Sequence, residues 1–107
     1  MQTKLEDPTL QMAYEKLRVY TALGNRLRLS AFFVIAKNPG LSFNQIRKKL
    51  KVEKGLLAYH LAVLKAGGLV SFTYARKGRE TSSYQLTDMG KNMYTELSER
   101  LNEPKTD

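Results

Sequence analysis

Apolar residues recur every three or four positions along most of this chain, and short stretches rich in Gly, Pro, Asn or Asp separate these segments. The first such segment predicts a helix over residues 8–23, which Asp7 can cap and Pro8 can open. One face of this helix collects small and apolar side chains, namely Leu10, Ala13, Tyr14, Leu17 and Thr21. A second helix is predicted over 26–37, ended by Asn38-Pro39-Gly40.

The middle of the chain predicts two short helices joined by a tight turn. Ser42 and Gln45 have the spacing of a capping box, in which each side chain satisfies a free backbone N–H of the other. This box opens a helix over about 43–50, and Lys51-Val52-Glu53 makes a short turn. A further helix over about 54–66 ends at Gly67-Gly68, which suits a left-handed helix end.

A hairpin and a last helix follow. Apolar and polar residues alternate from Leu69 to Arg76, which predicts a half-buried strand, and Thr81 to Leu86 reads as the returning strand. Residues 77–80 would form the tip of the hairpin. Thr87 can cap a helix over 88–101, whose apolar residues recur in steps of four at Met89, Met93, Leu97 and Leu101.

This order predicts a mainly α fold with a small β-hairpin wing, that is, a winged helix-turn-helix. The 107 residues suit one domain over 1–107, with the helix-turn-helix at 43–66 and the wing at 69–86. So small a domain buries a modest core, and apolar stripes on helices 8–23 and 88–101 indicate a partner subunit. We expect these helices to dimerise through Leu10, Tyr14, Leu17, Met93, Leu97 and Leu101.

Charge separates the middle of the chain from its ends. The formal net charge is +8, and residues 26–91 hold thirteen basic and three acidic residues, a local net of +10. Residues 1–25 sum to zero and residues 92–107 to −2. A basic centre between neutral or acidic ends is typical of a protein that binds a polyanion, although a basic surface that only keeps the protein in solution gives the same count.

The residue types present argue against metal sites and catalysis. The chain has no Cys and one His, so disulfides, zinc fingers and iron–sulfur clusters are excluded, and we expect no cofactor. We find no nucleophile–base pair, paired carboxylates or glycine-rich phosphate loop, and therefore do not expect an enzyme. The first residues do not form a signal peptide and no apolar run reaches about 20 residues, which predicts a cytoplasmic protein without membrane spans.

The helix over 54–66 carries the candidate DNA-reading surface. Leu57, Leu61 and Leu64 share one face and are expected in the core. The opposite face is small, apolar or aromatic, which lets a helix approach the floor of a major groove. Its candidate base contacts are Lys54, Gly55, Leu56, Tyr59 and His60. The alternative is that Leu56 and Tyr59 pack against another protein segment.

The residue His60 has two readings, because it lies at the edge of the core face. A hydrogen-bonded structural role or a phosphate contact is favoured over metal binding or base catalysis. Basic residues around the helix are expected to hold the DNA. Wing contacts to a minor groove or to phosphates are expected from Arg76, Lys77 and Arg79, unless the tip is simply a solvated turn. Backbone contacts are expected from Asn44, Arg47, Lys48, Lys49 and Lys51.

Three segments resemble the ArsR-like and MarR-like winged-helix regulators. Within 50–70, the run Tyr59-His60-Leu61 with Leu64 and Gly68-Leu69-Val70 is similar to the family's helix-turn-helix. Residues 25–29 and 84–90 are similar to the start of its preceding helix and to the close of its wing, so the likeness covers about 25–90.

This resemblance implies a homodimer that binds a roughly palindromic operator. It places base contacts at Lys54, Gly55, Leu56 and Tyr59 and wing contacts at 76–79. Two features depart from the family. Glu53 stands where Ser or Thr is usual, with Gly55 and Leu56 where small polar residues are usual, so the sequence preference can differ. The cysteines of the metal sensors are absent, which leaves metal regulation unsupported.

The sequence therefore predicts a homodimeric transcription regulator that binds specific double-stranded DNA. An architectural protein that coats DNA with little preference and a winged-helix module for protein interaction remain as alternatives. A small-molecule effector has no direct support in the sequence. A cleft lined by Met12, Met89 and Met93 would suit such a ligand, although these methionines are more simply explained as the core of the dimer.

Overall fold

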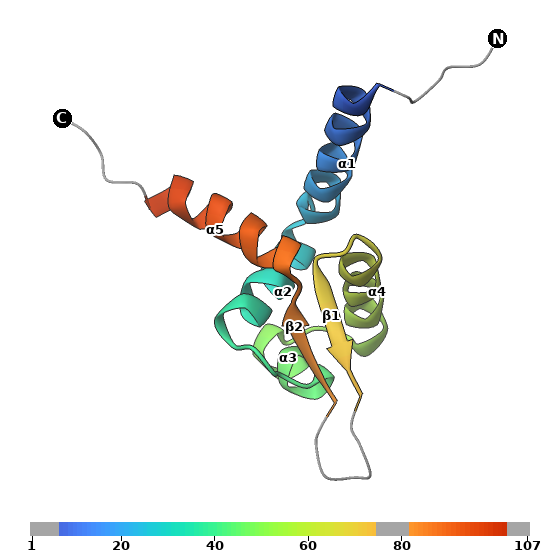
Figure 1. Cartoon of the computed structure of the whole chain (residues 1–107). Coiled ribbons are helices and arrows are strands. Elements are labelled where there is room, and N and C mark those ends of the chain that lie inside the picture. Colours follow the sequence, from blue (N-terminus) through green and yellow to red (C-terminus); the bar gives the residue numbers. More distant parts are fainter. Residues whose placement is uncertain (1–6, 75–81, 103–107) are drawn as a thin grey trace.

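The computed structural model describes residues 7–74 and 82–102. Of residues 100–102 it describes only the backbone. The described residues form five helices and one hairpin, in the predicted order (Figure 1). The bounds are α1 Pro8–Leu23, α2 Arg26–Lys37, α3 Phe43–Leu50, α4 Lys54–Ala66, β1 Val70–Thr73, β2 Ser83–Leu86 and α5 Asp88–Asn102. The fold is a winged helix, as predicted. The first strand covers Val70–Thr73, whereas the alternation of residues predicted a strand from Leu69 to Arg76.

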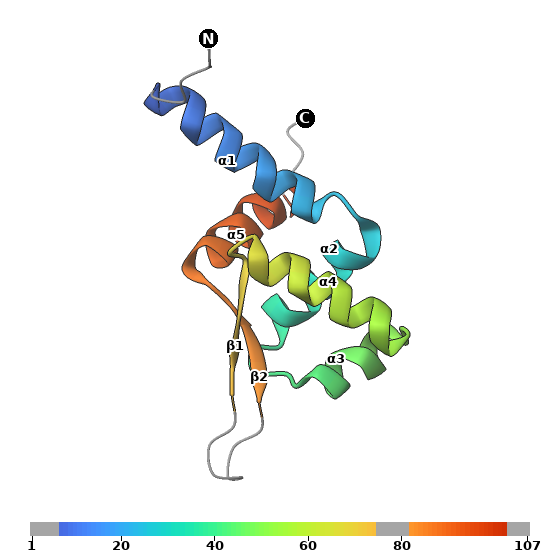
Figure 2. The ribbon, with the colours of Figure 1, turned by 90° about the vertical axis from the view of Figure 1, so that its right-hand side faces the viewer.

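The helices α2, α3 and α4 gather into one body, against which the hairpin packs. Helices α1 and α5 leave this body in diverging directions, at the end of the molecule opposite to where β1 ends and β2 begins (Figures 1 and 2). None of the described helices combines the length and the apolar composition needed to cross a membrane.

Local hydrogen bonds set where the helices begin and end. The Asp7 carboxylate accepts from Thr9 N at 2.9 Å, which starts α1. Both halves of the predicted capping box form at α3, because Gln45 N donates to Ser42 Oγ at 3.1 Å and Ser42 N donates to Gln45 Oε1 at 2.9 Å. After α4, Gly68 has a φ of 77°, the left-handed conformation predicted for Gly67-Gly68.

The core confirms the predicted inner face of α4. Leu57, Leu61 and Leu64 are 0–2% exposed. They pack in one cluster with fully buried side chains of the neighbouring elements, namely Phe32 and Ile35 of α2, Ile46 of α3 and Leu69 before β1. Burying a leucine or isoleucine contributes about 1.5–3 kcal/mol, so this cluster orients α4 within the fold.

The hairpin is held from two sides. In the β1–β2 pair, Val70 lies opposite Leu86 and Phe72 opposite Tyr84. On its other edge, Tyr84 donates to Leu41 O at 2.9 Å and accepts from Gly40 N at 3.0 Å, so the loop after α2 acts as a short third strand. This bridge was not predicted, because a single pairing leaves no periodic pattern in the sequence.

Among the residues that the structure describes, His60 is the only buried side chain that is polar or charged, with 5% of its surface exposed. Its Nδ1 lies 3.2 Å from Arg28 Nη1, and Arg28 Nε donates to Ala22 O at 2.5 Å. Because a guanidinium can only donate, Nδ1 accepts and the proton of the neutral ring lies on Nε2. Arg28 thus connects the last turn of α1 with α4. Burial, followed by the charge of Arg28, lowers the pKa of His60.

The start of α5 rests on the turn between α4 and β1. Thr87 Oγ1 donates to Gly68 O at 2.6 Å and accepts from Gly90 N at 3.0 Å, which confirms Thr87 as the cap. Thr87 N also donates to Leu69 O at 3.1 Å. Gly90 is buried, and a Cβ on it would overlap the carbonyl oxygen of Leu69. This close approach requires glycine at position 90.

On α5, the residues predicted to form a dimer surface are not free to do so. Met93 is 5% exposed and belongs to the core of its own protomer, and Leu97 is partly buried against the same core. The assignment of Met93 to a dimer interface is therefore wrong. The side chain of Leu101 lies outside the described residues. On α1, by contrast, Leu10, Tyr14 and Leu17 are 44%, 54% and 61% exposed.

Replacing Gly90 with Ala should destabilise the fold by roughly 1–3 kcal/mol, because the added methyl group must displace backbone rather than a flexible side chain. Gly55→Ala is the matched control. Its Cβ would meet only the Glu53 side chain, at 3.4 Å, and alanine favours helix. Urea unfolding measures both variants, and equal stability of Gly90→Ala and wild type would contradict the close approach.

The buried imidazole of His60 should make stability depend on pH. The unfolded chain protonates this ring near its ordinary pKa of about 6.5, whereas the folded protein binds the proton only at lower pH. The free energy of unfolding should therefore fall as pH drops from about 6.5 towards the lowered pKa. His60→Gln has no imidazole to protonate, so its free energy of unfolding should lack the fall that His60 causes below pH 6.5. Parallel pH profiles of the two proteins in urea unfolding would exclude the effect.

Candidate nucleic-acid interface

The helix α4 begins at a carboxylate cap. Glu53 is the N-cap residue, and its Oε1 accepts from Leu56 N at 2.9 Å. Backbone hydrogen bonds from Gly55 and Leu56, with a smaller contribution from the Arg47 charge, lower the pKa of Glu53. Glu53 was expected in the turn before the helix, and its role as the cap was not predicted, because Ser, Thr, Asp and Asn are the usual residues at this position.

Beyond this cap, α4 presents the predicted uncharged face. Leu56 and Tyr59 are 44% and 59% exposed. Gly55 and Ala62, which have little or no side chain, are exposed on the same face. Lys54 is exposed in the first turn of the helix. This arrangement confirms that the face is open in the protomer and that the leucines of the opposite face hold it outward.

His60 was grouped with the candidate base contacts of α4, but its environment differs from theirs. Its ring is buried, meets the Tyr59 ring edge-on at 5.2 Å and faces Arg28. This placement matches the hydrogen-bonded structural role and corrects the grouping of His60 with the exposed residues of α4. Its signal in the sequence was its position beside the leucine face.

Cationic side chains of α3 surround a hollow next to α4. This hollow has a volume of about 620 Å³, and four of the five predicted backbone contacts line it together with Val52, namely Asn44, Arg47, Lys48 and Lys51. Arg47 is steadied by donation from its Nε to Val52 O at 3.2 Å. Lys49 is exposed outside the hollow. We call this group the α3 notch.

The predicted wing contacts Arg76, Lys77 and Arg79 lie outside the described residues. The described base of the hairpin shows where the wing starts. The end of β1, the start of β2 and α3 lie on the same side of the molecule, away from α1 and α5 (Figures 1 and 2). At this base, Phe72 packs against Tyr74 and Tyr84 with ring centroids 4.7 and 4.6 Å apart.

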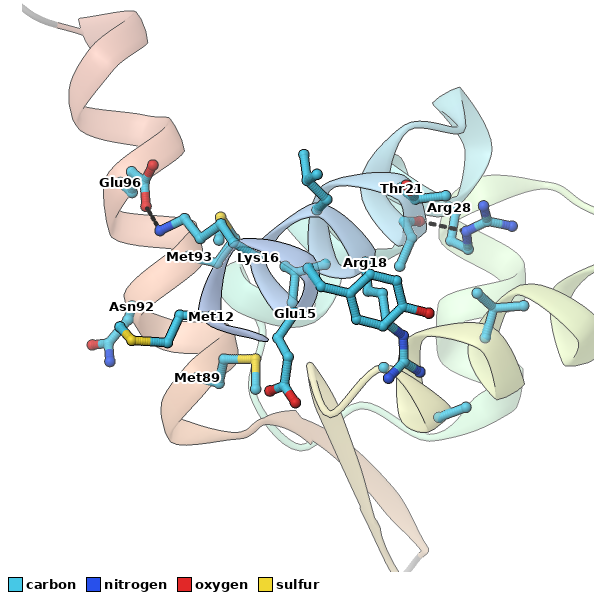
Figure 3. Close-up of a pocket in the computed structure, with 17 residues that line it drawn as sticks. Met12, Glu15, Lys16, Arg18, Thr21, Arg28, Met89, Asn92, Met93 and Glu96 are labelled. Atoms are coloured by element: carbon cyan, nitrogen blue, oxygen red, sulfur yellow. Dashed lines mark hydrogen bonds and ion pairs between the residues drawn. The ribbon is translucent and has the colours of Figure 1, made fainter. Parts of the chain in front are cut away.

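A groove of about 900 Å³ lies between α1, α5 and the end of α4 (Figure 3). It brings together Met12, Met89 and Met93, the three methionines expected to line a cleft. Along one side, Glu96 of α5 pairs with Lys16 at 3.5 Å and accepts from Tyr20 Oη at 2.9 Å. Within the described part of the chain, no three His, Asp or Glu side chains are placed to share a metal ion.

Comparison with known proteins agrees with this geometry. HlyU from Vibrio cholerae is 30% identical, with a TM-score of 0.68 over 84% of this chain and 94% of that one. An ArsR-like transcriptional regulator from Rhodococcus is 25% identical, with a TM-score of 0.65 over 85% of this chain and 82% of that one.

A third structure shows the same fold at lower identity. It is a homodimeric winged helix-turn-helix DNA-binding domain from Mycobacterium bovis, 20% identical with a TM-score of 0.73 over 99% of both chains. A comparison with curated proteins finds no match.

The sequence of residues 27–104 matches the family described as winged helix DNA-binding domain. This segment runs from the first turn of α2 past the end of α5 and includes α4, the α3 notch and the wing. The protein therefore belongs to the winged helix DNA-binding domain family.

Proposed function

We propose that this protein is a transcription regulator that binds specific double-stranded DNA as a homodimer. The observation that carries the proposal is the uncharged, exposed face of α4 beside the cationic α3 notch. Such a pairing suits a helix that reads bases while its neighbour holds the phosphate backbone. The transcriptional regulators among the structural neighbours support the same assignment.

The exposed face of α4 suits a major groove for steric and chemical reasons. Gly55 and Ala62 allow close approach, since neither has a side chain long enough to hold the helix away from the base edges. Leu56 can contact a thymine methyl group, and the Tyr59 hydroxyl can donate to or accept from a base. Lys54, in the first turn, can donate to a guanine edge or to a phosphate.

The α3 notch suits the phosphate backbone. Arg47, Lys48 and Lys51 carry three positive charges around one hollow, and the Asn44 amide adds a neutral donor. Contacts of this kind supply affinity and orientation without reading sequence. The proposal includes the wing residues Arg76, Lys77 and Arg79 as contacts to a minor groove or to flanking phosphates, and excludes His60 because it is buried.

The homodimer is proposed through α1. This helix is buried only at Val19, Ala22 and Leu23 near its end, and its exposed apolar residues Leu10, Tyr14 and Leu17 share another face. A second copy can cover this face, and the Mycobacterium bovis homodimer of the same fold supports such an assembly. Two-fold symmetry would present two α4 helices to a roughly palindromic site in the cytoplasm.

Tyr59→Ala and Lys48→Ala should separate base reading from backbone binding. After selection of bound sequences from a random DNA pool, Tyr59→Ala should reduce discrimination between selected and random duplexes by about 1–3 kcal/mol. Lys48→Ala should instead weaken both duplexes alike and reduce the salt slope of log K by about 0.9, since one phosphate contact is lost. Fluorescence anisotropy at several salt concentrations measures both effects.

Identical behaviour of the two variants would contradict the division of roles. A wild-type protein that binds random and selected duplexes equally would be a DNA-coating protein. One that ignores duplex DNA at low salt would indicate a protein-interaction module.

Leu17→Lys should convert the dimer to monomer, because it places a charge in the middle of the exposed apolar face of α1. Sedimentation velocity measures the change in mass. Leu56→Lys, the same exchange at an exposed leucine of α4, should leave the dimer intact. A monomeric wild type, or a dimer unchanged by Leu17→Lys, would refute the proposed interface.

A further inference from the structure

One carboxylate stands alone among the cations of the helix-turn-helix. Residues 42–66 contain six basic residues, and Glu53 is the single acidic one. It lies at the start of α4, the end of a recognition helix that contacts base edges in helix-turn-helix proteins. A negative charge at this place opposes the attraction that the rest of the segment exerts on DNA, and it therefore needs an explanation.

Hydrogen bonds hold this carboxylate in a defined position. Glu53 Oε1 accepts from Leu56 N at 2.9 Å. The group is exposed, and the backbone N–H groups at the start of α4 lower its pKa, so it is ionised at neutral pH. It cannot swing away from an approaching duplex without giving up the cap of α4.

The cap changes what the end of α4 can bind. Free backbone N–H groups at a helix start form a ready site for a phosphate, but here the Leu56 amide already donates to Glu53. A phosphate would also meet a like charge. The carboxylate has about four acceptor positions, and those not used by the backbone can only accept from a donor.

We propose that Glu53 is a specificity-determining residue, which rejects phosphates and accepts from the amino group of a base, cytosine N4 being the matching donor in the major groove. The inference rests on the proposed function, since it requires α4 to enter DNA. In this arrangement the α3 notch binds the backbone, and Glu53 keeps phosphates away from the backbone amides at the start of α4. The residue lowers the affinity for random DNA and thereby raises the specificity.

Removing the charge tests the first half of the proposal. Glu53→Gln, and Glu53→Ser with its short capping oxygen, should bind random duplex DNA more tightly than wild type at low salt, by about five-fold, the factor that one unit-charge contact near 4 Å in water supplies. The gain should shrink as salt screens the charge. Glu53→Asp keeps both charge and cap and should bind random DNA as wild type does.

A matched control separates local from net charge. Glu99→Gln removes one exposed carboxylate from α5 and changes the net charge equally, so it should leave random-DNA affinity nearly unchanged. If Glu53→Gln and Glu99→Gln gave the same affinity, or if Glu53→Gln bound random DNA more weakly than wild type, the inference would be wrong. Thermal unfolding of each variant confirms that only folded protein is compared.

Selection from a random pool tests the second half. With Glu53→Gln, the motif should lose its preference for C·G at one position of each half-site while the other positions persist. An unchanged motif would overturn base reading by Glu53. Failure of the wild-type protein itself to bind any duplex at low salt is a different result, because it would overturn the proposed function as a whole.

Discussion

The packing of one face of α4 against α2 and α3 determines the rest of the site. Leu57, Leu61 and Leu64 are buried side by side, and a helix with one face held in the core must turn its opposite face to solvent. The charge pattern is superimposed on this geometry. The basic residues lie mainly in the α3 segment and in the wing, so the exposed face of α4 can consist of uncharged residues such as Leu56 and Tyr59.

Polar contacts at the start, middle and end of α4 complement the leucine packing. At its start, Glu53 satisfies backbone amides that would otherwise be free, and in its middle His60 meets Arg28. At its end, the turn through Gly68 carries both β1 and the first turn of α5, through Thr87. The helix α4 is thus held at several points along its length, which favours a defined orientation over a mobile one.

The sequence predicted the elements better than it predicted their partners. Periodicity, the Ser42–Gln45 box and the Gly67-Gly68 stop placed the helices and the buried leucines, because these signals are local. It placed Met93 in a dimer interface, although Met93 lies in the core of its own protomer. A stripe in steps of four shows that a face is apolar but not which surface covers it.

Two of the three contacts that the sequence did not predict share a physical cause. The bridge between Leu41 and Tyr84 and the contact between Arg28 and His60 join residues far apart in the chain, and a single long-range pair leaves no pattern. The Glu53 cap is local, but it uses a residue type uncommon at helix starts. That the basic residues of α3 lie close together could be expected from the sequence, because they are close neighbours in the chain.

The anchoring of α1 at one end gives the helix the geometry of a lever. Its 16 residues extend about 24 Å at 1.5 Å per residue, while its buried side chains all lie in the last five positions. A tilt of about 5° at that anchor displaces the far end by roughly 2 Å. If two copies join through the far half of α1, small angular adjustments at Val19–Leu23 would change the distance between the α4 helices of the two copies.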